Sequence, residues 1–221
     1  MIQPTSDVGV LDKAVAILDA LADRPLALAA LSETTGYHRA TAHRLATALE
    51  AHGFVRRDSS GRFCLGGRLV QLGDVAAKGF PLRDVARLAL TALVEATGES
   101  AQLYVRDGTS TRVCVDSVES PQGLRTIVDA GAVLPLDRGS AGKILRGDVA
   151  AIKRGWAESV GEREAGVASV SAPIFDLDGV VRAAVSVSGP IDRTTKQPGA
   201  RYARSVLEAA RAIETAAGWG R

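Results

Sequence analysis

The sequence predicts an α+β protein with two domains, a small helical domain that carries a β-hairpin and a larger domain built on a sheet. Apolar residues follow helical spacing before Thr97, fall in short extended runs from Ser100, and return to helical spacing from Gly199 to Ala217. The chain has 221 residues, which is enough for two compact cores. We place the two domains at residues 1–78 and 79–221.

Two helices are expected at the start of the first domain. Ser6 or Asp7 can cap the first helix, whose apolar stripe ends before Pro25. The second helix is predicted from Ala27 to Thr34, and Gly36 supplies the backbone freedom that its C-terminal turn requires. These two helices would support a third.

The third helix, predicted from Arg39 to Ala51, has one apolar and one polar face. Apolar residues recur at i, i+3, i+4 and i+7 from Ala42, so this side should face the core. On the other side Ala40 leaves room for close approach to a groove, and the polar neighbours can bind base edges or phosphates. We interpret this segment as a recognition helix. Its predicted DNA-contacting residues are Arg39, Ala40, Thr41, His43, Arg44 and Thr47.

A two-stranded hairpin follows the third helix. Residues 54–57 and 62–65 read as strands, and the Asp-Ser-Ser-Gly sequence between them is good turn chemistry. Arg57 and Arg62 flank the tip, where a wing would contact the phosphate backbone. The order of three helices and a hairpin is that of a winged helix-turn-helix.

Positive charge is concentrated in this region. Six arginines and two acidic residues lie between Gly36 and Gly73, a local net charge of +4 in a chain whose formal net charge is +2. Such a cluster on one helix and one hairpin is typical of proteins that bind duplex DNA. A merely solvated arginine face is one alternative. A protein-interaction module is another, but it leaves the outward arginines unexplained.

A linker helix and the first helix of the next domain come after the hairpin. Helical patterns cover residues 68–78 and 82–97, and Pro81 between them starts a new helix. The buried stripe expected in the second of these helices comprises Val85, Leu88, Ala89 and Ala92.

The rest of the second domain contains hairpin patterns framed by helices, which suggests an α+β sensor domain. The turn sequences at residues 107–108 and 176–179 each join two strands. Ser140 can cap a helix over residues 140–146. The predicted strands are residues 101–106, 112–118, 124–128, 167–175 and 180–188.

An enzyme is the rival class, and the residue types argue against it. His38, His43 and His52 all lie in the first domain, so the second has no imidazole for nucleophilic catalysis or for a His-ligated metal. Residues 139–143 are faintly similar to a phosphate-binding loop, but Ile144 stands where Ser or Thr would bind magnesium. We therefore expect no cofactor and no metal site.

The cysteines and the apolar runs of the sequence indicate the cellular compartment of the protein. Cys64 and Cys114 are isolated, so we expect small core residues in a reduced protein, with a redox switch as the less favoured alternative. No apolar run is long enough to span a membrane, and the N-terminus lacks the pattern of a signal peptide. These features predict a cytoplasmic protein without a membrane partner.

Several spaced motifs make the chain similar to one known family. They are Gly36–Leu45, Leu49–Val55, Gly139–Lys143, Glu164–Val167, Ser171–Ile174 and Val185–Pro190. Along nearly its whole length the chain resembles an IclR-family transcriptional regulator. Residues 9–14, 97–104 and 161–164 look like the actinobacterial branch that regulates leucine and tryptophan biosynthesis.

The resemblance implies a winged helix-turn-helix domain, a linker helix used in dimerisation and a GAF-like effector-binding domain with an antiparallel sheet. It implies a homodimer or tetramer that binds a double-stranded DNA operator and responds to a small-molecule effector. A regulator of an aromatic or keto acid catabolic pathway is the alternative, and a small-molecule-binding protein without a DNA role is a further one. The implied effector-binding residues are Ser140, Ala141, Ser159, Ser169, Ser186 and Ser188.

The residues themselves agree with an effector that carries a carboxylate, such as an amino acid. Free N–H groups at a helix start near Ser140 would suit an anion. Ser186 and Ser188 face the same side of a strand, so both hydroxyls can enter one cavity. Serines that only pack or cap are the alternative.

Three positions depart from the family pattern. His38 stands where many members have Pro, and Ser159 and Ser169 replace an Asp and a Cys of the family's pocket. The replacements put a keto acid of the pyruvate kind in doubt. The connection at residues 146–153 is also shorter than in relatives, so the segment that covers the effector is reduced or partly absent.

Overall fold

The computed structural model describes residues 8–78 and 82–220. The chain divides into two compact units, Met1–Gly79 and Phe80–Arg221, which we describe separately. The expected caps Ser6 and Asp7 and the expected break at residues 79–81 lie outside the described residues.

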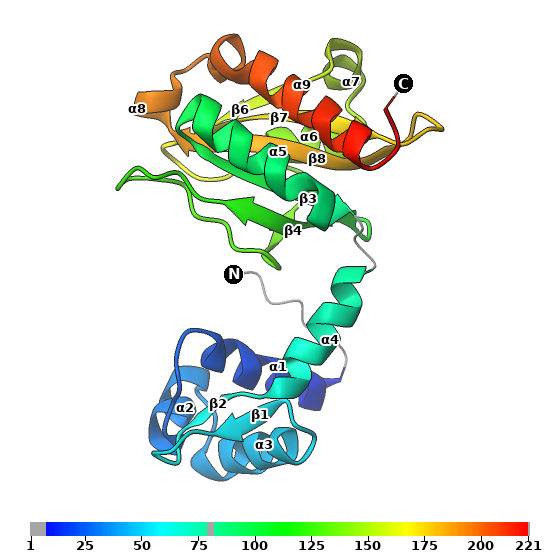
Figure 1. The fold of residues 1–221 in the computed structure, drawn as a ribbon. Helices are drawn as coiled ribbons and strands as arrows, with labels where there is room; N and C mark the ends of the chain where they lie inside the picture. The colour runs from blue at the N-terminus through cyan, green and yellow to red at the C-terminus, as the bar shows by residue number, and fades with distance from the viewer. Residues whose placement is uncertain (1–7, 79–81, 221) are drawn as a thin grey trace. The chain divides into compact units, whose positions relative to one another are not determined.

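The first unit is a three-helix core with a hairpin and a following helix (Figure 1). Ile17, Leu31 and Phe63 are fully buried at its centre. A backbone bridge between Leu26 and Phe63 ties the segment before the second helix to the hairpin. The elements are α1 (Gly9–Ala22), α2 (Leu28–Thr35), α3 (Arg39–Ala51), β1 (Val55–Arg57), β2 (Phe63–Leu65) and α4 (Gly67–Lys78).

The ends of these helices differ in how they are capped. Val8 occupies the N-cap of α1 without a side-chain capping bond. Gly36 closes α2 with a φ of 70°, in the left-handed region that the sequence led us to expect. Between hairpin and α4 the backbone passes so close that a Cβ on Gly66 would lie 2.2 Å from the carbonyl oxygen of Gly53. Only glycine fits there.

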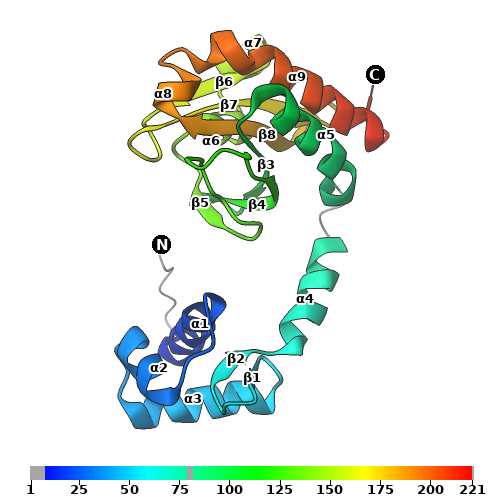
Figure 2. The same ribbon diagram turned by 60° about the vertical axis from the view of Figure 1, so that its left-hand side comes forward.

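The second unit is a six-stranded antiparallel sheet in the order β5-β4-β3-β8-β7-β6. Helices α5 and α9 cover one face and contribute to the larger apolar cluster, while α6 packs on the other face (Figure 2). The strands are β3 (Ser100–Asp107), β4 (Thr111–Val118), β5 (Val133–Pro135), β6 (Ala157–Val160), β7 (Val167–Phe175) and β8 (Val181–Pro190). The helices are α5 (Leu82–Thr97), α6 (Ser140–Leu145), α7 (Val149–Arg154), α8 (Ile191–Thr194) and α9 (Pro198–Ala216).

The buried face of α5 is only partly the one expected. Val85 and Ala89 do pack against the core, but Leu88 is 83% exposed and Ala92 is exposed as well. The buried stripe is centred on Ala86 and Leu90, four residues apart on the adjoining face. The sequence pattern was wrong there because alanines and leucines occur on both sides of this helix.

The strand predicted at residues 124–128 does not form. Residues 131–135 pair with β4 instead, through backbone hydrogen bonds at Cys114 and through β5. Since one side of β4 is already paired with β3, this pairing takes up its remaining edge. Three short elements, α7, β6 and α8, were not anticipated because each spans six residues or fewer and shows little periodicity.

None of the helices in the described ranges is long and apolar enough to cross a membrane.

Candidate functional site

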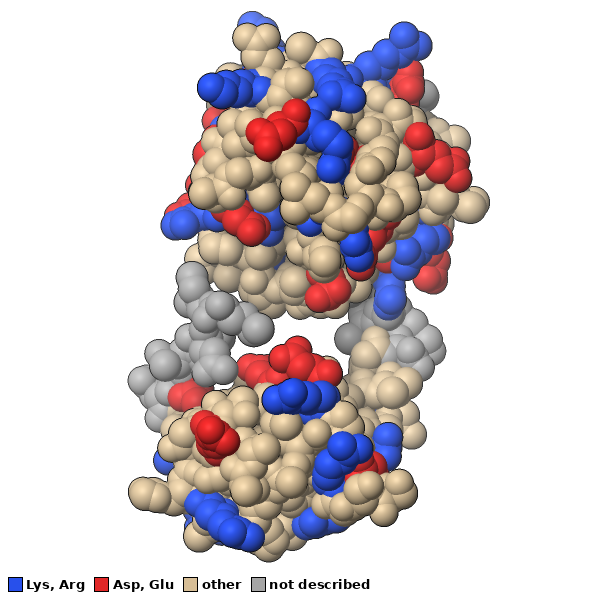
Figure 3. Space-filling view, turned by 90° about the vertical axis from the view of Figure 1, so that its left-hand side faces the viewer, with Lys and Arg blue, Asp and Glu red and all other residues tan. Residues whose placement is uncertain are grey.

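The outward face of α3 is exposed as the amphipathic pattern predicts. Ala42, Leu45 and Ala46 are buried, whereas the opposite side is open to solvent. Figure 3 shows basic side chains along the lower edge of this unit, the edge at which Figure 1 draws α3, while acidic and basic side chains both occur higher on the visible face. Of the predicted contact residues, Arg39, Ala40, His43, Arg44 and Thr47 are exposed and Thr41 is half-buried.

The two wing arginines named from the sequence are held by neighbouring groups. Arg57 donates to Glu50 Oε2 at 3.3 Å and stacks over the Phe63 ring at 4.1 Å. Arg62 donates from Nε to Asp58 Oδ2 at 2.8 Å. To bind a phosphate, each guanidinium group would have to break its interaction with the neighbouring carboxylate or bind both groups at once.

Asp58 organises the tip of the wing. Its Oδ1 accepts the backbone N–H groups of Ser60 and Arg62, each at 2.9 Å, while Oδ2 faces the Arg62 guanidinium. The backbone donor of Arg62 is the largest contribution that lowers the pKa of this carboxyl, and the guanidinium adds to it. The carboxylate is therefore ionised wherever DNA binding would be measured.

Arg56 is the basic residue of the hairpin that the sequence analysis did not single out. It is exposed on β1, and it has no ion-pair or ring partner within the described part of the chain. The same holds for Arg39 and Arg44 on α3. The signal for Arg56 was present in the Arg-Arg pair, but only the position flanking the tip was chosen.

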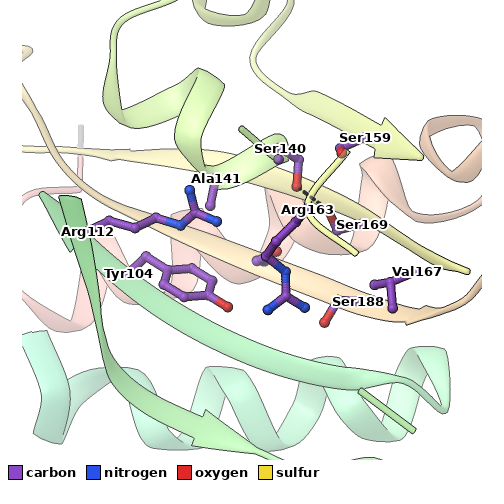
Figure 4. A pocket seen from close by; sticks show the side chains of 11 residues that line it. Tyr104, Arg112, Ser140, Ala141, Ser159, Arg163, Val167, Ser169 and Ser188 are labelled. Atoms are coloured by element: carbon purple, nitrogen blue, oxygen red, sulfur yellow. Dashed lines mark hydrogen bonds between the residues drawn. The ribbon is translucent and has the colours of Figure 1, made fainter. Parts of the chain in front are cut away.

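A pocket in the second unit brings together every residue that was predicted to bind effector. The space in it that a water-sized molecule can occupy is about 20 Å³, room for one or two waters, so a larger ligand has to widen the pocket as it binds. It lies on the α6 side of the sheet, and Figure 4 shows the side chains that converge on it. The predicted residues that line it are Ser140, Ala141, Ser159, Ser169, Ser186 and Ser188.

The serines line up because of the strand register. Ser159, Ser169 and Ser188 are successive cross-strand partners on β6, β7 and β8, and Ser171 lies opposite Ser186 in the next row. Cross-strand partners share a face of the sheet. Ser171, which is fully buried, was missed although it lies two residues after Ser169, the spacing that places residues on one face.

Hydroxyl groups form a connected network beside the pocket. The Oγ of Ser140 lies 2.7 Å from the Oγ of both Ser169 and Ser171, and Ser171 donates to Ser186 at 2.9 Å. Ser140 is the first residue of α6 rather than its cap, because Gly139 is the N-cap and no side chain caps this helix. The predicted capping role was wrong, and the hydroxyl serves the network instead.

Two arginines and a tyrosine also line the pocket, and sequence reasoning found none of them. Arg112 enters from β4, Tyr104 from β3 and Arg163 from the loop after β6 (Figure 4). Arg112 is 2% exposed and lies over the Tyr104 ring at 5.2 Å from its centroid. Burial raises the pKa of Tyr104, so its hydroxyl stays protonated.

The buried guanidinium group of Arg112 is only partly satisfied by hydrogen bonds. Its Nη1 donates to the carbonyl oxygens of Pro135 and Arg138, the latter at 2.8 Å, but its buried Nε has no hydrogen-bond partner. Burial lowers the pKa of this guanidinium, and the positive charge of Arg163 lowers it further. A second incompletely satisfied group, Gln102, accepts from Ser188 at 3.0 Å while its Nε2 is buried without a partner.

Comparison with known proteins relates both units to one family. The model of the IclR helix-turn-helix domain matches residues 10–59, and that of the bacterial transcriptional regulator IclR C-terminal domain matches residues 75–151 and 145–215. The chain belongs to the IclR family of transcriptional regulators. Members of the IclR family are DNA-binding regulators and not enzymes, so the enzyme alternative is set aside.

Individual IclR relatives cover almost the whole chain. The glycerol operon regulatory protein of Streptomyces griseus is 30% identical over 247 aligned positions, which cover 96% of this chain and 97% of that protein. The crystal structure of Thermotoga maritima IclR has a TM-score of 0.75 at 26% identity and covers 96% of this chain and 99% of that one. The expected α+β fold is thus confirmed.

The solved structure of a third IclR relative contains a bound ligand. The IclR homolog from Microbacterium hydrocarbonoxydans, crystallised with 4-hydroxybenzoate, has a TM-score of 0.75 at 21% identity and covers 94% of this chain and 98% of that one. At this identity the likeness concerns the fold.

The comparisons also bear on the short connection after α6. The C-terminal family model matches in two pieces that meet at residues 145–151, and the alignment with the S. griseus regulator is longer than the 221 residues of this chain. Relatives therefore carry residues that this chain lacks. The remaining connection folds as α7, whose first turn is capped by Asp148.

Proposed function

We propose that this IclR-family regulator binds an operator through α3 and the β1–β2 wing and changes its DNA binding when a small carboxylate enters the pocket of the second unit. The observation that carries the proposal is the convergence of six sequence-predicted residues on one pocket that two arginines also line. A buried arginine beside hydroxyl donors is well suited to an oxyanion.

For DNA, the proposed base-reading residues are those of the exposed face of α3, namely Arg39, Ala40, Thr41, His43, Arg44 and Thr47. The proposed backbone contacts are Arg57 and Arg62, and we add Arg56 because it has no competing partner among the described residues. This division follows the general pattern in which helix side chains read the major groove while wing residues bind phosphates.

For the effector, the arginines carry more of the argument than the start of α6. The helix has six residues, and the N–H of Gly139 already donates to Glu162 Oε2 at 3.2 Å. Arg112 and Arg163 supply the positive charge, and the serine hydroxyls supply orientation.

Control of amino-acid biosynthesis is the finer proposal, and an amino acid or another carboxylate is the proposed effector. The S. griseus relative is named for a glycerol operon, and the M. hydrocarbonoxydans homolog was crystallised with an aromatic acid. Regulation of a catabolic pathway is therefore the second candidate. Comparing amino acids, keto acids and aromatic acids as stabilising ligands separates the two.

A homodimer or tetramer in the cytoplasm is part of the proposal. Val10, Leu11 and Val15 on α1 and Val70 and Val75 on α4 are each at least 46% exposed, which is unusual for large apolar side chains. A second copy of the chain would cover them and present a second recognition helix. Two helices can read both halves of a palindromic operator.

The experiment that tests the proposed function is a thermal-shift screen of the full chain with small carboxylates, repeated with the Ser140→Asp variant. We expect one or more acids to raise the melting temperature of the wild type and to have no effect on the variant, whose added carboxylate repels an anion. If no acid stabilises the wild type, or if the variant responds equally, the pocket is not the effector site.

A further inference from the structure

The effector pocket contains more positive charge than one carboxylate would balance. Arg112 and Arg163 are the charged side chains among the described residues that line it, and no acidic side chain joins them. The lining therefore carries a net charge of +2. Buried or half-buried charges without counter-charges are costly, so this arrangement calls for an explanation beyond packing.

Neither arginine has a carboxylate within direct hydrogen-bond distance among the described residues. Arg112 donates to two backbone carbonyl groups and leaves Nε without a partner, and no carboxylate in the described ranges pairs with it. Arg163 is half-buried, and its ion pair within the described part of the chain is with the exposed Glu164, at 3.7 Å. That distance is long for a charge-assisted hydrogen bond, so the pair contributes little.

The two guanidinium groups come from different parts of the unit. Arg112 belongs to β4, while Arg163 belongs to the loop between β6 and β7, and Figure 4 shows them reaching the same pocket. Tyr104 and the serine hydroxyls of α6, β7 and β8 complete the lining between these elements. A ligand in this space would therefore meet positive charge from two directions and hydroxyl donors in between.

We infer that the effector is a small dianion, a short dicarboxylate or a phosphate monoester, with one unit of its negative charge facing Arg112 and the other facing Arg163. The inference rests on the proposed function and specifies its ligand class. A monocarboxylate would leave one arginine unbalanced in a partly desolvated pocket. A dianion balances both, and the hydroxyl network orients its oxygens.

The second negative charge should have a measurable effect on affinity. A hydrogen bond to a charged group is worth more than one to a neutral group, and the difference corresponds to about 2-fold to 30-fold in the dissociation constant. Succinate and succinamate isolate this effect, because they have nearly the same shape and differ by one carboxylate replaced with an amide.

The test is isothermal titration calorimetry of the full chain with these two probes, in the wild type and in Arg163→Gln. We expect the wild type to prefer succinate by about 2-fold to 30-fold and the variant to bind both probes equally. Arg138→Gln is the matched control, because Arg138 is an exposed arginine next to Gly139 that does not line the pocket. The control should keep the wild-type preference, and circular dichroism checks that the variants are folded.

The possible results separate this inference from the proposed function. If the wild type binds succinamate or propionate as tightly as succinate, the dianion is refuted while a carboxylate effector stands. If Arg163→Gln keeps the preference for succinate, the role of Arg163 is refuted. If inorganic phosphate binds the wild type more tightly than succinate does and Arg163→Gln removes that difference, the dianion is supported and a phosphate ester is its source; tighter binding of succinate supports a dicarboxylate. If no anion binds, both proposals fail.

Discussion

Replacing Asp58 by Asn should strengthen DNA binding, because this carboxylate holds Arg62 away from the phosphate backbone. The substitution can remove the ion pair and leave the turn intact, because the two carboxylate oxygens of Asp58 have different partners. Oδ1 accepts both backbone N–H groups of the wing tip, whereas Oδ2 receives only the Arg62 side chain. An Asn that keeps its oxygen at the Oδ1 position retains the turn, and its amide group no longer attracts a guanidinium.

The expected size of the effect follows from the ion pair and from counterion release. Arg62 is 50% exposed and pairs with Asp58 at 2.8 Å, and an exposed pair of this kind changes an equilibrium constant by no more than about fivefold. Freeing the guanidinium therefore raises affinity up to about fivefold at fixed salt. One additional phosphate contact also steepens the slope of log K against log salt by about 0.9.

Fluorescence anisotropy with a mixed-sequence duplex over a range of salt concentrations measures both quantities without knowledge of the operator. Asp23→Asn is the matched control, because it removes the same charge from the C-cap of α1, outside the hairpin. The double variant Asp58→Asn with Arg62→Ala should lose the gain. An Asp58→Asn protein that binds no better than Asp23→Asn, with an unchanged slope, would show that Arg62 does not contact DNA.

Three further predictions follow from the geometry. Arg56→Ala should weaken binding to all duplexes and reduce the salt slope by about 0.9. Arg44→Ala should instead weaken binding to a selected operator by about 1–3 kcal/mol and binding to scrambled DNA by less. Equal losses for operator and scrambled DNA in both variants would contradict the assignment of Arg44 to bases and Arg56 to phosphates. Gly142→Ala should lower the unfolding free energy of the second unit by about 1–3 kcal/mol in urea titration, because a Cβ would lie 2.5 Å from the carbonyl oxygen of Leu136; an unchanged midpoint would mean that α6 shifts freely. The pKa of Asp58 is lowered on folding, so the ionised carboxylate stabilises the wing at neutral pH, and this contribution is lost progressively as the pH falls below about 4. Protection of the wing amides against hydrogen exchange should therefore decrease there in the wild type but not in Asp58→Asn.

The sequence was most informative where local chemistry decides the structure. The bounds of α3 were predicted to the residue, because its apolar stripe is regular and lies between turns at Gly36 and Gly53. The burial of one α3 face and the common face of Ser186 and Ser188 both follow from simple periodicity. These features need no knowledge of distant parts of the chain.

Other features depend on partners far away in sequence, and these were missed. The stripe of α5 is selected by the sheet and by α9, not by its own pattern, and Leu88 was therefore assigned to the wrong side. Residues 124–128 were excluded from the sheet because residues 131–135 pair with the edge of β4. The pocket arginines were missed for the same reason, since Arg112 and Arg163 lie 51 positions apart and meet only after six strands have assembled.

The two positive charges that would favour an anion in the pocket also repel each other. Arg112 is nearly fully buried, and its pKa is lowered mainly by burial and additionally by the positive charge of Arg163, so the two guanidinium groups repel each other. An anion removes this repulsion at the moment it binds, and part of its binding free energy comes from that relief. A ligand shifts a conformational equilibrium only to the extent that it binds one state better than another. Because the repulsion depends on how close Arg163 lies to Arg112, we propose that an effector anion would act first on the position of the loop that carries Arg163.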